Sequence, residues 1–291
     1  CFNTNYRSDG NCRSCVVEVE GERTLTPSCC RRPEHGMKVY THSERAESSR
    51  KMVLEMLESD TENHQSAKKN NELRKWTDKL EIKNARLPAN IDKRFDDSNP
   101  AIAVNYDACI KCTRCIRACR EAQANDVIGF AFRGKESRIV FDLDDNMGSS
   151  TCVSCGECVQ ACPTNALISK TELTTNKQKV KQTNSVCPYC GVGCLLTFNT
   201  SNNKIFSVTG RNGPSNQSRL CVKGRYGFDY IHHKDRLTSP LIRRPGTKKT
   251  KTLLTQEDIN KNFRVGTWDE ALDITAKKLK GIYSKYGSGA I

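Results

Sequence analysis

The sequence predicts an α+β protein made of several small domains. Three observations support this class: a length of 291 residues, an apolar fraction of 36% that falls to about 30% without cysteine, and 17 cysteines in four clusters. A chain so poor in apolar residues cannot fill one large core, so each small domain needs disulfides or metal for stability. The absence of a long apolar run and of a secretion signal predicts a cytoplasmic protein without a membrane span.

Two of the clusters repeat one spacing, C-x2-C-x2-C-x3-C. The first run is Cys109, Cys112, Cys115 and Cys119, and the second is Cys152, Cys155, Cys158 and Cys162, followed by Pro163. Bacterial ferredoxins with two [4Fe-4S] clusters have this spacing, and in them the fourth cysteine of each run binds the other cluster. We therefore predict one cluster bound by Cys109, Cys112, Cys115 and Cys162 and another bound by Cys119, Cys152, Cys155 and Cys158. Zinc ribbons lack this doubled pattern, and an odd cysteine total without a secretion signal argues against disulfides.

The segments around the two runs favour a small α+β domain over 99–170. Short strands are predicted at "AIAVNYD" (101–107), "SRIVFDLDD" (137–145) and "NALIS" (165–169). The first run departs from the usual pattern at one position, where Arg120 stands in place of proline. This departure leaves the ligands intact and affects only the turn that follows.

The first cluster of cysteines has a different spacing, C-x10-C-x2-C-x13-C. It comprises Cys1, Cys12, Cys15 and Cys29, and it is similar to the plant-type [2Fe-2S] arrangement of two close and two distant cysteines. The strand-like "VVEVEGERTL" (16–25) indicates that β-rich loops carry these thiols. Spacing alone allows either Cys29 or Cys30 as the fourth ligand. We expect Cys30 to be the spare cysteine and to be buried as a small apolar residue.

The last cluster, C-x2-C-x3-C-x26-C, suits either zinc or a third [4Fe-4S] cluster. Its members are Cys187, Cys190, Cys194 and Cys221. The segments that follow, "CVKGRYGFDYIHHKDRLTSPLIRR" and "VGTWDEALD", favour the iron–sulfur alternative.

With these four sets in this order, the chain resembles the N-terminal part of the alpha (catalytic) subunit of molybdenum- or tungsten-dependent, NAD-linked formate dehydrogenase, a molybdopterin oxidoreductase. The matching blocks are "GNCRSCVVEVEGERTLTPSC", the segment from "CIKCTRCIRAC" to "CVSCGECVQACP", and "CPYCGVGC" with "CVKGRYG" and "RLTSPLIRR". The resemblance implies an N-terminally truncated, β-grasp-like [2Fe-2S] domain at 1–42, a helical linker at 43–98, a double [4Fe-4S] ferredoxin domain at 99–170, a molybdopterin oxidoreductase [4Fe-4S] domain at 180–240 and the start of the molybdopterin-binding catalytic domain at 241–291.

The resemblance also implies an electron path and its partners. Formate would deliver electrons to a Mo- or W-bis(molybdopterin guanine dinucleotide) centre, and one [2Fe-2S] and three [4Fe-4S] clusters would carry them to a flavin- and NAD-binding iron–sulfur beta subunit, with a gamma subunit as a further candidate. Lys223 resembles the family's lysine between the last [4Fe-4S] cluster and the pterin. The catalytic residues, with Cys or selenocysteine as nucleophile, are expected beyond Ile291, so no catalytic residue is assigned here.

One departure from the resembled family lies in the linker. Many relatives bind an extra cluster there through H-x3-C-x2-C-x5-C, but no cysteine occurs between Cys30 and Cys109. We expect His42 and His64, which remain in this region, to be surface residues. Helices are predicted instead over "SERAESSRKMVLEMLESD" (43–60) and around Leu73, Trp76 and Leu80.

Three alternatives stay open. The large peripheral-arm subunit of NADH dehydrogenase shares the [2Fe-2S] start but lacks the double-cluster insert, and an iron-only hydrogenase would lack the 187–221 block. A stand-alone multi-cluster electron carrier is disfavoured by the amphipathic helix predicted at "TWDEALDITAKKL", which contains Trp268, Leu272 and Leu279.

The positive charge of the chain does not indicate nucleic-acid binding. The formal net charge is +14, and four clusters of about −2 each, thiolates included, leave roughly +6. The densest basic tract, "KTELTTNKQKVKQTN" (170–184), has no aromatic residues among its charges and is expected to be a solvated linker. No nucleic acid is therefore expected among the partners.

Overall fold

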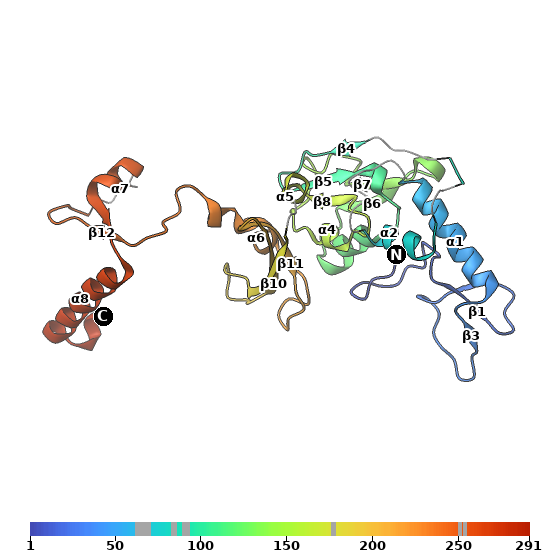
Figure 1. The fold of residues 1–291 in the computed structure, drawn as a ribbon, viewed down its shortest axis with the longest axis horizontal. Coiled ribbons are helices and arrows are strands. Elements are labelled where there is room, and N and C mark those ends of the chain that lie inside the picture. The colour runs from blue at the N-terminus through green and yellow to red at the C-terminus, as the bar shows by residue number, and fades with distance from the viewer. Residues whose placement is uncertain (62–70, 83–85, 89–93, 176–178, 250–251, 253–254) are drawn as a thin grey trace. The chain divides into compact units, whose positions relative to one another are not determined.

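The computed structural model describes residues 1–291 except 62–70, 83–85, 89–93, 176–178, 250–251 and 253–254 (Figure 1). Contacts divide the chain into two compact units, Cys1–Phe228 and Asp229–Ile291. Within the described part of the chain, no helix has the length and apolar character that a bilayer crossing requires.

The N-terminal module is a small antiparallel sheet covered by a helix. Its strands, in the order β2-β1-β3, are β1 (Val16–Val19), β2 (Thr26–Pro27) and β3 (Val39–Tyr40). Val16 and Val17 point to opposite faces of β1, and both are buried. Helix α1 (Glu44–Ser59) begins at Ser43, whose side chain accepts a hydrogen bond from the Ala46 amide, and packs on β1. The helix predicted here is confirmed, and the strand predicted at 16–25 is confirmed over Val16–Val19.

Helix α2 (Glu72–Lys79) confirms the second helix predicted in the linker. Leu73 is buried, whereas Trp76 is about half exposed, with Lys79 Nζ 4.9 Å from the centre of its ring. The Glu72 carboxylate receives two hydrogen bonds, at 2.7 and 2.8 Å, from the guanidinium of Arg114. Because this paired geometry fixes both groups, α2 is attached to the module that carries the two cysteine runs.

That module combines two sheets with short helices. A three-stranded sheet has the order β4-β5-β8, and β6 and β7 form a hairpin; all pairs are antiparallel. The elements are β4 (Phe95–Asp96), β5 (Ile102–Asn105), β6 (Ile128–Ala131), β7 (Arg138–Phe141), β8 (Leu167–Ser169), α3 (Arg114–Arg117), the π-helical turn η2 (Ala118–Ala122) and α4 (Glu157–Ala161), with 3-10 turns η1 (Tyr106–Ala108) and η3 (Gly134–Glu136). The three strands predicted beside the runs are therefore confirmed.

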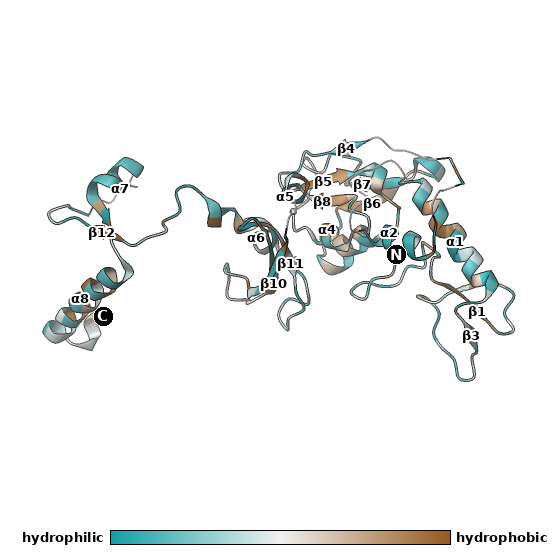
Figure 2. Cartoon of the chain, viewed as in Figure 1, coloured by the Kyte–Doolittle hydropathy of each residue, from teal (hydrophilic) through white to brown (hydrophobic). Residues whose placement is uncertain are grey.

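The core of this module contains apolar side chains and cysteines together. Phe141, Ile102 and Ile139 are almost completely buried, and Cys115, Cys119 and Cys158 belong to the same cluster of buried residues. Figure 2 shows apolar residues concentrated on β5 and β8. The packing of the core and the placement of the thiols therefore depend on each other.

The last part of the first unit is an antiparallel sheet in the order β11-β10-β9, joined to the preceding module by α5 (Lys170–Thr174). Its strands are β9 (Lys181–Val186), β10 (Leu195–Ser201) and β11 (Lys204–Gly210). Asn202 and Asn203 connect β10 to β11 with φ of 50° and 59°, as a tight hairpin turn requires. Helix α6 (Val222–Tyr226) packs on β11 and leads into the 3-10 segment η4 (Gly227–His232).

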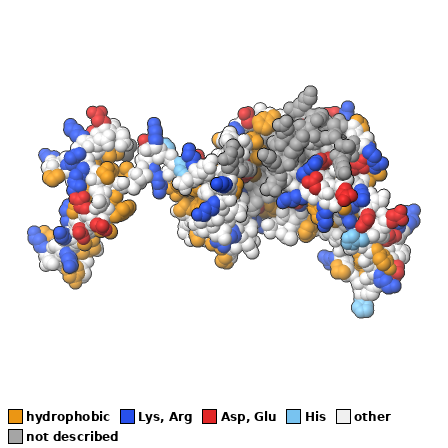
Figure 3. Space-filling model, in the orientation of Figure 1, with side chains coloured by type: hydrophobic (Ala, Val, Ile, Leu, Met, Phe, Trp, Pro, Cys, Tyr) orange, Lys and Arg blue, Asp and Glu red, His pale blue; other side chains and the backbone are white. Residues whose placement is uncertain are grey.

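The second unit consists of a two-stranded sheet, β12 (Leu241–Arg243) with β13 (Phe263–Val265), and the helices α7 (Gln256–Asn262) and α8 (Trp268–Tyr286), followed by η5 (Ser288–Ala290). Helix α8 confirms the amphipathic helix predicted there. Trp268, Leu272 and Leu279 are exposed, and Figure 3 shows hydrophobic and basic side chains together on the surface of this segment.

We expect Phe141→Ala to destabilise the double-run module by about 3–5 kcal/mol, because it removes a completely buried ring from a packed core. Denaturant unfolding followed by circular dichroism measures the change. Phe130→Ala on the neighbouring strand is the control, since that ring is 47% exposed and its removal should cost much less. Equal losses in the two variants would contradict the placement of the core.

Candidate iron–sulfur sites

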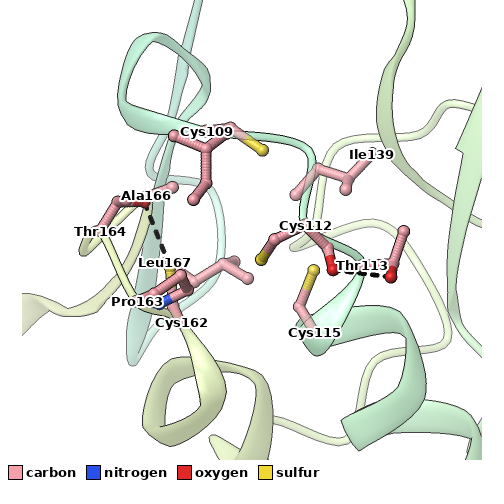
Figure 4. Close-up of a pocket in the computed structure, with 11 residues that line it drawn as sticks. Cys109, Cys112, Thr113, Cys115, Ile139, Cys162, Pro163, Thr164, Ala166 and Leu167 are labelled. Atoms are coloured by element: carbon pink, nitrogen blue, oxygen red, sulfur yellow. Dashed lines mark hydrogen bonds between the residues drawn. The ribbon is translucent and has the colours of Figure 1, made fainter. Parts of the chain in front are cut away.

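Four cysteines from both runs surround one cavity. Cys109, Cys112 and Cys115 lie in the loop before α3 and at its start, and Cys162 follows α4; together with Ile139 and Leu167 they line the cavity (Figure 4). The Thr164 hydroxyl, which donates to the Ala108 carbonyl at 2.6 Å, holds the segment after Cys162 against the loop of the first run. The fourth cysteine at this site therefore comes from the second run.

The remaining four cysteines of the runs form a second group. Cys119 lies in the π-helical turn, and its charge contributes to raising the pKa of both Cys152 and Cys158, after the larger effect of burial. Cys155 adds to the shift at Cys158 in the same way. The charge of Cys162 also contributes to raising the pKa of Cys158, so the two groups are adjacent. Each run thus places its last cysteine with the three cysteines of the other.

The chemistry of these groups fits cluster binding. Burial raises the pKa of Cys109 to about 12 and that of Cys115 well above the ordinary value, and neighbouring thiolates add to both shifts. Several thiolates in an apolar site are stable only with a cationic partner that displaces their protons. Among the described residues, no three His, Cys, Asp or Glu side chains converge as they would on one metal ion.

The loops of both runs have the same unusual backbone. Lys111 and Ser154 occupy equivalent positions with φ of 54° and 53°, and Thr113 and Gly156 do so with φ of 63° and 74°. Left-handed conformations are costly for residues other than glycine. Here they wrap each loop around its sulfur atoms, and Thr113 is held by its hydroxyl, which donates to Asp9 Oδ2 at 2.6 Å.

The N-terminal thiols lie in two pairs. The Cys12 amide donates to Cys1 Sγ at 3.5 Å, and the Cys29 thiol is hydrogen-bonded to Cys15 and Cys30, which contributes, after burial, to raising its pKa to about 12. Cys30 Sγ is 3.7 Å from Cys29 Sγ. The prediction that Cys30 is buried is wrong: its side chain is exposed, because Cys30 lies in the turn that follows β2.

The last four cysteines are gathered between β9 and α6. Burial raises the pKa of Cys194, and the charges of Cys187, Cys190 and Cys221 add to the shift. The Cys187 amide donates to the Cys194 carbonyl at 2.8 Å, and Cys221 is the residue at which α6 begins. Cys190 and Cys221 are exposed, so this group lies nearer the surface than the two groups of the double-run module.

The other residues singled out from the sequence are at the surface or outside the described chain. Lys223 lies on α6 two residues after Cys221 and is exposed. His42 is exposed, with Nδ1 2.7 Å from the Thr41 hydroxyl, as the prediction for it requires. His64 lies outside the described residues.

Sequence reasoning missed a buried polar network that joins three modules. The Tyr6 hydroxyl donates to Glu157 Oε1 at 2.9 Å, and Arg225 Nη2 donates to Glu157 Oε2 at 3.1 Å. Arg225 also donates to the Cys155 carbonyl at 2.8 Å and to Gln160 Oε1 at 2.9 Å. The position of Glu157 inside the second run is the only sequence signal, because nothing local relates it to Tyr6 or Arg225.

A second missed residue, Arg117, joins the N-terminal module to the first run. Its guanidinium is almost completely buried and donates to the carbonyls of Arg7, Cys1 and Cys112. Beside it, the Asn11 side chain donates to the Lys111 carbonyl at 2.7 Å. The loops that carry Cys1 and Cys112 are thereby held next to each other.

Three family models match separate parts of the chain. A 2Fe-2S iron-sulfur cluster binding domain matches residues 1–44, a 4Fe-4S dicluster domain matches 108–166, and a molybdopterin oxidoreductase Fe4S4 domain matches 180–233. Each range contains one or two of the cysteine groups described above. Three successive segments of the chain are therefore similar to iron–sulfur cluster binding domains.

Curated relatives match along the whole chain. A "Putative formate dehydrogenase" of Staphylococcus haemolyticus is 26% identical over 331 residues, which cover 99% of this chain and 32% of the relative. A protein of the same name from Staphylococcus aureus (strain bovine RF122 / ET3-1) is 26% identical over 335 residues, covering 100% and 32%. The chain thus spans about a third of the length of these relatives.

A solved structure is similar as well. The crystal structure of an NAD+-reducing [NiFe]-hydrogenase in the H2-reduced state matches with a TM-score of 0.54 and 26% identity, covering 58% of this chain and 74% of that one. The order of its iron–sulfur domains thus makes the chain similar both to the putative formate dehydrogenases and to the NAD+-reducing hydrogenase.

Loss of the hydroxyl should affect the free energy of unfolding differently at Tyr226 and at Tyr6. Tyr226 has a buried hydroxyl without a hydrogen-bond partner among the described residues, so Tyr226→Phe should leave stability unchanged or raise it. Tyr6→Phe removes a donor to a buried carboxylate and should cost about 1.5–3 kcal/mol. Denaturant unfolding of the two matched variants gives the comparison, and a larger loss in Tyr226→Phe would contradict it.

Proposed function

We propose that the chain is the electron relay of a formate dehydrogenase alpha subunit, with one [2Fe-2S] and three [4Fe-4S] clusters. The observation that carries the proposal is the exchange of Cys119 and Cys162 between the two runs, which is typical of double-cluster ferredoxins. The clusters would be held by four sets: Cys1, Cys12, Cys15 and Cys29; Cys109, Cys112, Cys115 and Cys162; Cys119, Cys152, Cys155 and Cys158; and Cys187, Cys190, Cys194 and Cys221. Cys29 is preferred to Cys30 because its thiol is hydrogen-bonded to Cys15.

The neighbour relations of the sites support a linear order. Arg225, four residues after Cys221, reaches the Cys155 carbonyl, so the last site adjoins the site of Cys119, Cys152, Cys155 and Cys158. Cys158 and Cys162 then connect the two sites of the double-run domain. Arg117 connects Cys112 with Cys1. Electrons would follow this order, one at a time, from the last [4Fe-4S] site to the [2Fe-2S] site.

The complete enzyme would supply the two ends of the relay. A Mo- or W-bis(molybdopterin guanine dinucleotide) centre oxidises formate to CO2 when bound in such enzymes, and Lys223 would lie between it and the Cys187 site. A flavin- and NAD-binding iron–sulfur subunit would accept the electrons beyond the [2Fe-2S] site. The chain would comprise five parts, with limits at 1–42, 43–98, 99–170, 180–240 and 241–291.

A second candidate is a subunit of an NADH dehydrogenase or NAD-reducing hydrogenase type. The similarity to the NAD+-reducing hydrogenase structure supports it. The 180–233 match to the molybdopterin oxidoreductase domain favours formate dehydrogenase instead. Assays of the complete enzyme with formate, H2 and NADH as electron donors discriminate: reduction of an acceptor by formate supports the first proposal, and reduction only by H2 or NADH supports the second.

Anaerobically purified protein should contain about 14 iron atoms per chain with a matching amount of acid-labile sulfide. Iron, sulfide and zinc analysis, with EPR of the reduced sample, should give signals of both two-iron and four-iron clusters. About 10 iron atoms with stoichiometric zinc would instead assign the Cys187 to Cys221 site to zinc. Little iron after reconstitution would overturn the proposal.

Serine substitutions test the exchange of the fourth cysteines. Cys162→Ser should abolish the same EPR signal as Cys109→Ser, and Cys119→Ser the same signal as Cys152→Ser, because a missing thiolate disrupts only the cluster that it binds. Each variant should lose up to about 4 iron atoms. If Cys119→Ser instead matched Cys109→Ser, each run would bind its own cluster and the proposed ligand sets would be wrong.

A further inference from the structure

The Tyr6–Glu157–Arg225 network lies between two of the candidate cluster sites. Glu157 is at the start of α4, directly before Cys158, and Arg225 is in α6, four residues after Cys221. Their relative exposures are only 1% and 4%. The charged pair therefore occupies the interior of the boundary between the second cluster site of the double-run domain and the last site.

Hydrogen bonds satisfy both the Glu157 carboxylate and the Arg225 guanidinium. Both oxygens of Glu157 accept, one from Tyr6 and one from Arg225, and Arg225 donates further to the Cys155 carbonyl and to Gln160. Gln160 is itself fixed, because its amide nitrogen donates to the Ser218 carbonyl at 3.0 Å and its oxygen accepts from the Gly210 amide at 3.0 Å. Buried charges persist only with such pairing.

Close packing holds the Arg225 side chain against the loop of the second cysteine run. A Cβ atom at Gly156 would lie 2.2 Å from Arg225 Cδ, so glycine is the residue that allows Arg225 this close to the loop between Cys155 and Cys158. Burial raises the pKa of Cys155, whereas the backbone of Glu157 and the charge of Arg225 lower it. Because Arg225 Nε also donates to the Cys155 carbonyl at 2.8 Å, the positive charge lies beside the loop that carries Cys155 and Cys158.

Fixed charges near a cluster change its reduction potential. Reduction adds one electron, so a nearby positive charge stabilises the reduced state and raises the potential, while a negative charge lowers it. Solvent and salt screen buried charges far less than exposed ones. Arg225 and Glu157 lie beside the same site with opposite charges, and they are held there by contacts that do not depend on the cluster.

We propose that Arg225 and Glu157 together set the reduction potential of the cluster bound by Cys119, Cys152, Cys155 and Cys158, Arg225 raising it and Glu157 lowering it. The two residues are positioning residues at the point where this cluster would receive one electron from the Cys187 to Cys221 cluster and pass it to the cluster of Cys109, Cys112, Cys115 and Cys162. The inference rests on the proposed relay function and adds two residues that set the reduction potential at one step of it.

The test is a redox titration of the anaerobic chain, followed by EPR. Arg225→Gln should shift the midpoint potential of one four-iron signal downward, and Glu157→Gln should shift the same signal upward. The double variant should return it toward the wild-type value, since both charges are then absent. Signals of the other clusters should move less, and the shifts should persist at high salt because both charges are buried.

Arg120→Gln is the matched control. Arg120 carries the same charge directly after Cys119, a ligand of the same cluster, but its side chain is 56% exposed and is paired with Asp126. Solvent screens such a charge, so this variant should leave the potential within the scatter of replicate titrations. A shift as large as that of Arg225→Gln would show that burial of the pair is irrelevant and would overturn the inference.

The outcomes separate this inference from the relay proposal. If wild-type protein shows no four-iron signals, the relay proposal fails. If it shows them and Arg225→Gln and Glu157→Gln shift none, or shift one in the same direction, the relay stands and the inference is wrong. Should Arg225→Gln not fold, Arg225→Lys with and without Glu157→Gln supplies the comparison: removing Glu157 must raise the potential in either background.

Discussion

The structure depends on an exchange between two short loops: each loop places its fourth cysteine next to the first three cysteines of the other. Cys119 and Cys162 each follow a short helix, and each lies with three thiols of the other run. Cysteines of both runs belong to the same buried cluster as Ile102 and Phe141. Folding of this module is thus what brings the thiols of each group together, because neither run gathers four thiols by itself.

Polar contacts that involve buried arginines join the modules. Arg117 binds carbonyls of the N-terminal module, Arg114 pairs with Glu72 of α2, and Arg225 pairs with Glu157. Such contacts are directional and require one geometry, unlike apolar packing. In a chain with so few apolar residues, they fix the distances between the candidate cluster sites.

Local sequence patterns predicted most of the helices and strands singled out in the sequence analysis. Strands at 101–107, 137–145 and 165–169, the helices that contain Met52 and Leu73, and helix α8 all appear in the structure. Cys30 was expected to be buried and is exposed. The π-helical turn that carries Cys119 was not predicted, because no local pattern of the sequence indicates such a turn.

The sequence alone determined the cysteine groups, their order and the division into small modules, because ligand spacing and hydrophobic periodicity are local properties. Only the tertiary structure decided how the N-terminal group and the last group adjoin the double-run module and which residues lie between the groups. Tyr6, Glu157 and Arg225 are separated by 151 and 68 positions along the chain. No local pattern relates such residues, since their contact exists only after three modules have folded and packed together.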